Sequence, residues 1–272
     1  MEELIISAEH EEKNYWRDLW GYRELLYFLA WRDILVRYKQ TTVGVAWAFL
    51  RPVITIAIGT LIARKVAGIT QGAVPIVLVV SAGTLIWQLF SNAFSAAGES
   101  LISSSNLISK IYFPRLLVPA STLAVGLVDF LISLAILIGL MLWYRYIPDF
   151  RVLTLPLFII LALTASLGAG LWLAALTVKY RDFRFIVPFI VQIGLFISPV
   201  WYTSDKFEGA WRVVYSLNPV VGAIDGFRWA VFHGAYPLFW PGLTVSISTS
   251  LILLYTAVVY FRKTEKSFVD MI

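Results

Sequence analysis

The chain has 272 residues, of which 59% are hydrophobic and only 14% are charged, and its mean hydropathy is +0.78. This composition excludes an ordinary soluble domain and indicates an integral membrane protein. The net charge of +5 fits either nucleic-acid binding or membrane orientation, and the absence of cysteine excludes disulfides and thiolate metal sites.

The first segment of the chain predicts a helix that lies on a membrane surface. The acidic N-terminus lacks the basic and apolar regions of a cleaved signal peptide, and the uncharged runs between residues 20 and 40 are too short to cross ~30 Å of hydrocarbon. The helix has one apolar stripe, and most charged residues lie outside it, as in a juxtamembrane helix. The stripe contains Tyr27, Phe28, Trp31, Ile34, Leu35 and Tyr38. Docking on a partner protein is a compatible second interpretation.

Six uncharged apolar runs are long enough to span a bilayer, at about residues 45–63, 74–97, 116–142, 152–178, 185–203 and 239–261. An even number of spans puts both termini on one side. If that side is the inner one, the inner segments carry fourteen Lys and Arg and the outer segments carry seven, with Arg51 inside the first span near its inner end. The positive-inside rule therefore predicts cytoplasmic termini, and it assigns the basic excess to orientation rather than to nucleic acid.

A short polar segment, residues 98–115, joins the second and third runs. Glu99 lies early in it and Lys110 lies late, where their charges suit the two ends of a helix macrodipole. Pro114 cannot continue such a helix, but it fits the first turn of the next one. The segment therefore predicts a small surface helix between two spans, on the cytoplasmic side.

Residues 208–236, between the fifth and sixth runs, are too apolar for a solvated loop. They are interrupted at Asn218 and Pro219, and again by Asp225 and Arg228. Two helices of about ten residues reach only ~15 Å each, so neither can cross a membrane. A re-entrant hairpin that dips from the outer face and acts as a lid or gate is predicted, and an amphipathic hairpin resting on that face is the alternative.

The sequence shows no catalytic constellation. It lacks G-x-x-x-x-G-K-[ST], H-E-x-x-H and G-x-S-x-G, and 2 histidines leave little room for a metal centre. Asp129 lies in the middle of the third run, where a carboxylate must face the bundle interior and find a partner. It is either a proton or substrate site or a structural carboxyl hydrogen-bonded across helices. Arg51 can snorkel to the inner interface.

Aromatic residues make up 15% of the chain, more than the interfacial belts of six spans need. Rings with apolar faces and polar edges suit an amphipathic ligand, such as a sugar that slides over stacked faces. A role in a membrane belt or in packing is the alternative for each ring. The candidates for a substrate pathway are Trp87, Phe90, Phe94, Phe196, Trp201 and Tyr202.

Four stretches together resemble the membrane subunit of ABC-2 type exporters of polysaccharides, the O-antigen, capsule and teichoic acid permeases. The resemblance covers nearly the whole chain from Trp31 onward. Each stretch alone is a weak signal, but the four follow one another in the family's order. They are WRDILVRYKQTTVGVAWAFLRP at residues 31–52, NLISKIYFPR at 106–115, KYRDFRFIVPFIVQIGLFISPVWY at 179–202 and NPVVGAIDGFRWA at 218–230.

The resemblance implies a single all-α domain of six transmembrane helices over residues 1–272. Residues 1–44 would form a cytoplasmic tail and an amphipathic interface helix, residues 45–261 the membrane domain, and residues 262–272 a second cytoplasmic tail. Two copies would enclose a pathway in the bacterial inner membrane for a lipid-linked polysaccharide. Two separate ATPase subunits would bind ATP and Mg and supply the phosphate loop that this chain lacks, with no cofactor and no nucleic acid on this chain.

The resemblance also assigns roles to particular residues. The interface helix would contribute Trp31, Arg32, Asp33, Arg37 and Tyr38, and the outer gate Asn218, Pro219, Phe227 and Arg228. A coupling helix seated in the ATPase would contribute Glu99, Leu101, Ile102, Asn106, Leu107 and Lys110. The rival functions are an ABC-2 exporter of drugs or small lipids, and a membrane-embedded transferase acting on lipid-linked sugars.

Overall fold

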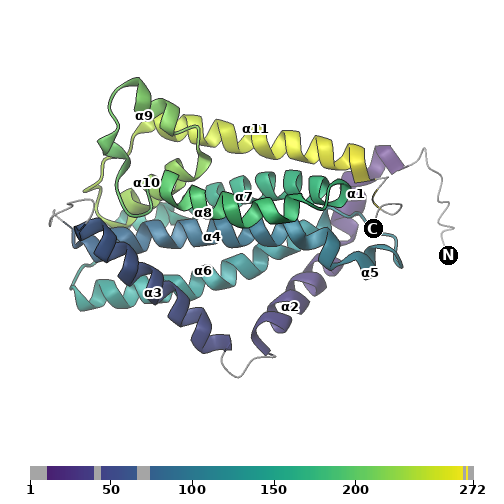
Figure 1. Ribbon diagram of the computed structural model, residues 1–272, viewed down its shortest axis with the longest axis horizontal. Coiled ribbons are helices and arrows are strands. Elements are labelled where there is room, and N and C mark those ends of the chain that lie inside the picture. The colour runs from purple at the N-terminus through teal and green to yellow at the C-terminus, as the bar shows by residue number, and fades with distance from the viewer. Residues whose placement is uncertain (1–10, 40–43, 66–73, 266–267, 269–272) are drawn as a thin grey trace.

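The computed structural model describes residues 11–39, 44–65, 74–265 and 268, and its regular elements within these ranges are all helical. Helices α4, α6, α7, α8 and α11 run side by side along the longest axis of the molecule (Figure 1). The elements are α1 Glu11–Gly21, α2 Arg23–Lys39, α3 Gly44–Lys65, α4 Ile76–Ser103, α5 Ser105–Ile108, α6 Leu117–Trp143, η1 Phe150–Thr154, α7 Leu155–Lys179, α8 Phe183–Ile197, η2 Ser204–Lys206, α9 Ala210–Tyr215, α10 Pro219–Val231 and α11 Trp240–Glu265. We call the end of the bundle with α5 the α5 end, and the opposite end, with α9, the α9 end.

Five helices are long and apolar enough to cross a membrane: α3, α4, α6, α7 and α11. They match five of the six predicted spans. The run at 185–203 does not form one long helix, because α8 has 15 residues and ends at Ile197. At 1.5 Å per residue it reaches only about 22 Å, which is less than the hydrocarbon thickness. Helix α8 stops because Ser198 precedes Pro199 and takes an extended backbone.

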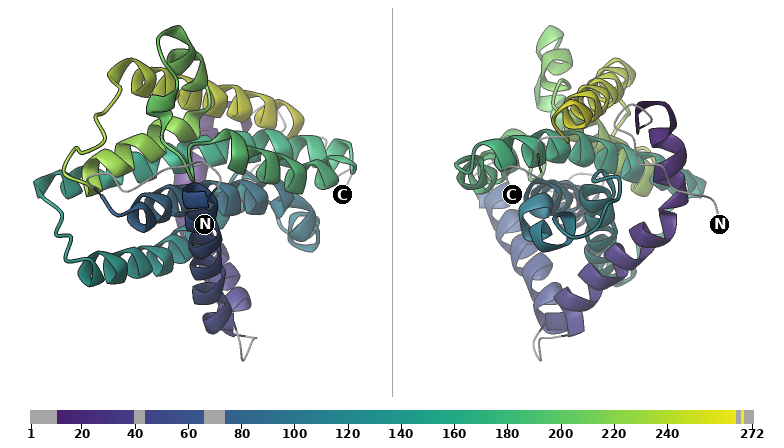
Figure 2. Two further views of the ribbon diagram at one scale, coloured as in Figure 1. Left: turned by 60° about the vertical axis from the view of Figure 1, so that its left-hand side comes forward. Right: turned by 90° about the vertical axis from the view of Figure 1, so that its right-hand side faces the viewer.

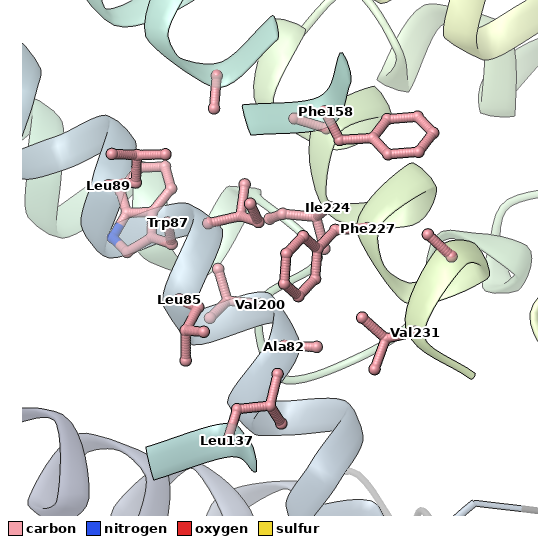
Figure 3. Packing of buried hydrophobic residues seen from close by; sticks show 14 of the residues in the cluster. Ala82, Leu85, Trp87, Leu89, Leu137, Phe158, Val200, Ile224, Phe227 and Val231 are labelled. Carbon is pink, nitrogen blue, oxygen red and sulfur yellow. The ribbon is translucent and has the colours of Figure 1, made fainter. Parts of the chain in front are cut away.

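Helix α4 is the centre of the bundle, in contact with α3, α6, α7, α8 and α10. Most of its side chains are buried, including Leu78, Leu85 and Leu89. Leu85 and Trp87 face the same cluster as Leu137 of α6, Phe158 of α7 and Phe227 of α10 (Figure 3). Burial on nearly all sides explains why the first half of α4, residues 76–87, is apolar around the helix rather than along a single stripe.

Helices α1 and α2 replace the single predicted surface helix. Seen along the bundle, α2 and α3 diverge from the other helices and converge at one corner (Figure 2, right). The predicted apolar stripe is divided: Tyr27, Phe28 and Trp31 are exposed, whereas Ile34, Leu35 and Tyr38 are partly buried. Helix α2 packs against α6, so only part of its apolar surface remains available to a membrane or a partner.

The segment at 98–115 differs from its prediction. Helix α4 continues through Gly98 and Glu99 to Ser103, and α5 has only 4 residues. Glu99 therefore lies near the C-terminal end of a long helix, where the macrodipole does not favour a carboxylate. The helix continues because Leu101 is buried and Gly98 packs against Leu173 of α7, and this packing outweighs the polar composition.

The segment at 208–236 contains two helices, α9 and α10, separated where the sequence predicted an interruption. Asn218 caps α10 by accepting a hydrogen bond from the Val220 backbone N–H at 3.1 Å, and Pro219 occupies the first helical turn. Helix α10 is mostly buried against α4, α7 and α11. It is therefore a structural part of the bundle rather than a separate surface hairpin.

Candidate functional site

The predicted coupling residues are divided among three segments at the α5 end. Glu99, Leu101 and Ile102 belong to the last turns of α4, Asn106 and Leu107 belong to α5, and Lys110 lies in the turn that follows. Leu101 is fully buried and Leu107 packs on the same apolar cluster, whereas Asn106 and Lys110 are exposed. The leucines therefore anchor the connector, and its exposed tip carries Asn106, Ser109, Lys110, Ile111 and Tyr112.

A polar cluster ties this connector to both ends of the described chain. The Arg115 backbone N–H donates to the Glu265 carboxylate of α11 at 2.7 Å, and the Tyr15 hydroxyl of α1 donates to the same carboxylate at 3.1 Å. The Arg115 guanidinium also donates to the Glu265 backbone carbonyl. Arg262 lies over the Tyr15 ring at 4.5 Å. Burial and the neighbouring carboxylate raise the pKa of Tyr15, so the phenol remains a neutral donor.

Sequence analysis missed this cluster. Its only signal is Glu265, an acidic residue in the basic stretch that follows the last predicted span. Through one carboxylate, Glu265 joins α1, α11 and the residues just before α6.

The predicted pathway aromatics fall into two groups. Trp87, Phe90 and Phe94 lie along one face of α4, with ring centroids 5.5 and 5.8 Å apart. Helix α8 covers these three rings, because Val187 packs against Phe94 and Gly194 approaches Trp87. The second group, Phe196, Trp201 and Tyr202, lies at the C-terminal end of α8 and beyond it, with Phe196 exposed. Their role in a pathway stays a prediction.

Arg228 organises the α9 end of the bundle, where the sequence predicted a gate. Its guanidinium is 1% exposed and donates to three backbone carbonyls: Val79 at 3.1 and 3.2 Å, Val200 at 2.8 Å and Tyr202 at 2.9 Å. Gly83 allows this approach, since a Cβ there would lie 2.5 Å from the guanidinium. Arg228 therefore fastens the segment after α8 to α4.

The other predicted gate residues support the same connection. Asn218 donates from its side-chain amide to the Ser198 hydroxyl at 2.9 Å, and Phe227 is fully buried with its ring edge-on to Phe130 at 6.2 Å. The hydroxyl of Tyr202 donates to the last carbonyls of α8, at Phe196 and Ile197. The structure thus brings together residues from two predicted sets, the gate and the second aromatic group.

Asp129 has the partners that a carboxylate within a span requires. It forms an ion pair with Arg37 of α2 at 2.7 Å, and it accepts hydrogen bonds from Asn92 of α4 at 3.0 Å and from the Tyr38 hydroxyl. Burial and this contact raise the pKa of Tyr38. The network joins α2, α4 and α6, as expected for a structural carboxyl. Elsewhere on α2, Arg32 pairs with Asp33 at 2.8 Å, and Trp31 is exposed.

Within the described ranges, no group of three or more His, Cys, Asp or Glu side chains is placed to hold a metal ion. At three of these sites one polar side chain, Glu265, Arg228 or Asp129, holds two or three segments of the chain together. This arrangement fits a protein whose helices must move as units.

Comparison with known proteins identifies the family. The profile of the ABC-2 type transporter family matches residues 24–232. The chain is 27% identical over 258 residues to the O-antigen export system permease protein RfbA of Myxococcus xanthus, across 94% of this chain and 98% of that protein. It is 22% identical over 250 residues to the protein of that name from Klebsiella pneumoniae, across 92% of this chain and 95% of that protein. Because the family profile matches most of its length, the chain belongs to the ABC-2 type transporters, as a non-catalytic membrane permease subunit.

Proposed function

We propose that this permease moves a lipid-linked, O-antigen-like polysaccharide from the cytoplasm to the outer side of the bacterial inner membrane. The observation that carries the proposal is the similarity over 94% of the chain to a permease of an O-antigen export system. Phe196, which is exposed at the end of α8, supplies a stacking surface for a sugar ring.

In the proposed topology, both termini and the α5 end are cytoplasmic, and the chain from 1 to 272 is one membrane domain. Lys110, Lys179 and Arg181 lie at or beside the α5 end, as the positive-inside rule requires. Helix α8 with the segment at 198–203 makes the fifth crossing, and its short length is compensated by the helices packed around it. Helices α9 and α10 then form the outer gate.

The proposed assembly contains two copies of this chain and two ATPase subunits. The exposed apolar side chains of α8 supply the surface for the second copy, among them Phe185 and Phe189. The ATPase subunits bind ATP and Mg and contact the exposed tip of the connector. Closure of the ATPase dimer on ATP moves this tip, and the Glu265 cluster transmits the movement to α1, α6 and α11.

Deleting the gene should abolish surface polysaccharide and leave lipid-linked polysaccharide inside the cell. Gel analysis of the surface glycan, with and without the gene restored, measures this. Unchanged surface glycan would contradict the proposal. Retained glycan together with increased drug sensitivity would instead favour an exporter of drugs or small lipids. Loss of lipid-linked glycan inside the cell as well would favour a membrane-embedded transferase.

Reversing the charge of Lys110 should uncouple the two kinds of subunit. Lys110 is exposed at the connector tip, so K110E changes the surface offered to the ATPase without affecting the buried anchors. We expect K110E to reduce glycan-stimulated ATP hydrolysis about fivefold or more, the loss from one interfacial charge contact, while membrane insertion stays normal. E99K, beside the buried Leu101, should have the same effect.

The matched control is Lys206→Glu, because Lys206 is also exposed but belongs to η2, four residues before α9. ATP hydrolysis by purified complexes carrying each variant, at equal subunit ratios, gives the comparison. Equal stimulation in K110E and the unmodified complex would count against coupling through this tip.

A further inference from the structure

A cavity of about 450 Å³ with both apolar and charged lining residues lies where α2 and α3 converge. Helices α4 and α6 form its floor, and Arg37, Trp47 and Arg51 on its walls are exposed, so it is accessible from outside the chain. The residues that line it are Arg37, Tyr38, Trp47, Ala48, Arg51, Pro52, Gln88, Asn92, Asp129 and Ser133.

The cavity has a net positive charge. It contains two guanidinium groups, Arg37 and Arg51, and one carboxylate, Asp129. The carboxylate is already engaged by Arg37 at 2.7 Å, by Asn92 and by the Tyr38 hydroxyl. Arg51, in contrast, has no ion-pair partner among the residues that the structure describes. Without a protein carboxylate beside it, this exposed guanidinium is available to an anion that the membrane supplies.

The surroundings of Arg51 indicate what that anion is attached to. Trp47, Leu50 and Ile54 of the same helix are exposed and apolar, so they can contact acyl or prenyl chains beside the cavity. The Gln88 amide inside the cavity adds N–H donors. Phosphate esters are the anions that a membrane supplies next to such chains, and arginine binds them through paired N–H donors.

We propose that this cavity binds the phosphate group of a membrane amphiphile, with Arg51 as its principal contact and the Arg37–Asp129 pair holding the opposite wall in place. The occupant is either a resident anionic phospholipid or the phosphate of a polyprenyl carrier. The site requires only that the chain lies in a membrane, so it does not depend on the cargo proposed above.

Lipid titration of the purified complex, followed by native mass spectrometry, tests the site. Two matched pairs of probes isolate the phosphate: phosphatidic acid against diacylglycerol, and a polyprenyl phosphate against the same polyprenol. Replacing Arg51 with glutamine should raise the dissociation constant for at least one phosphate probe about tenfold, as expected when one charge-assisted contact is lost. Binding of the neutral probes should not change.

Two further variants make the result specific. Arg51→Lys keeps the positive charge but not the paired N–H donors, so it should bind the phosphate probe more tightly than R51Q and more weakly than the unmodified complex. Arg64→Gln removes an arginine from the other end of α3, outside the cavity, and should have no effect. A stronger effect on the polyprenyl phosphate identifies a carrier site, and a stronger effect on phosphatidic acid identifies a resident lipid. Equal binding of both phosphate probes to R51Q and the unmodified complex would overturn the proposal, whether or not glycan export is found.

Discussion

Replacing Arg228 with alanine is expected to lower the free energy of unfolding by about 3–5 kcal/mol, because buried carbonyls lose their donor and a cavity is left behind. The guanidinium is 1% exposed and serves the carbonyls of Val79, Val200 and Tyr202. The segment after α8 would then detach from α4, so the loss should extend to any function that needs the α9 end. An apparent melting temperature lowered by about 10 °C is the expected scale.

Thermal unfolding of the purified complex, followed by size-exclusion chromatography, measures the effect. Lysine at position 228 should be nearly as disruptive, since an ammonium cannot reach three carbonyls with the geometry of a guanidinium. The matched control is Arg184→Ala, because Arg184 is exposed and its loss should change the free energy by less than about 0.5 kcal/mol. Equal melting temperatures for R228A and R184A would show that Arg228 does not fasten the α9 end.

Replacing Gly168 with alanine is expected to cost about 1–3 kcal/mol, because the added methyl group overpacks a helix contact. A Cβ at this position would lie 2.8 Å from the backbone nitrogen of Leu254 and 3.0 Å from its Cα. These are backbone atoms of α11, which cannot rotate away, so α7 and α11 would have to separate. Glycine here serves the close approach of two helices in the membrane.

The same substitution at Gly139 is the control for this prediction. Gly139 is also within a long helix, α6, but a Cβ there would meet nothing within 4 Å. Alanine at 139 should therefore be neutral or stabilise the helix by about 0.5–1 kcal/mol. Heating both variants in the same detergent gives the comparison. If G168A unfolds at or above the temperature of G139A, then α7 and α11 are not held as closely as described.

Arg51 and Arg228 differ in whether groups of the described chain satisfy their guanidinium groups. Arg228 is satisfied by three carbonyls of its own chain, so it is a structural fastener. Arg51 faces a cavity whose one carboxylate, Asp129, is paired with Arg37, and Arg51 has no ion-pair partner among the described residues. We therefore infer that Arg51 binds a ligand. Sequence position alone did not distinguish them, because both are single charges in apolar surroundings.

Apolar run length identified most of the fold. Five of the six predicted spans are long helices, because a run of about twenty apolar residues leaves few soluble alternatives. The interruption at Asn218 and Pro219 was also predictable, since an asparagine cap followed by proline is a local signal for the start of a helix. The family likewise followed from linear order, because four stretches in one sequence suffice to recognise it.

Tertiary contacts decided the rest. The polar residues 98–103 are helical because Leu101 and Gly98 pack on the neighbouring helix, a contact between residues far apart in sequence. The chain after α8 is held against α4 by Arg228, which lies 28 residues from Val200 in sequence. The partners of Asp129 and Glu265 are farther away along the chain: Tyr38 lies 91 residues from Asp129, and Tyr15 lies 250 residues from Glu265.

The sequence by itself determined that this protein is helical, membrane-embedded and a transporter permease, because hydrophobic length and local motifs are properties of contiguous residues. Only the tertiary structure decided which charges are satisfied within the chain and which are not. That distinction depends on where carbonyls and carboxylates from other helices lie, and no periodicity in the sequence encodes it. It separates Arg228, Asp129 and Glu265, which fasten helices, from Arg51, which we expect to bind a ligand.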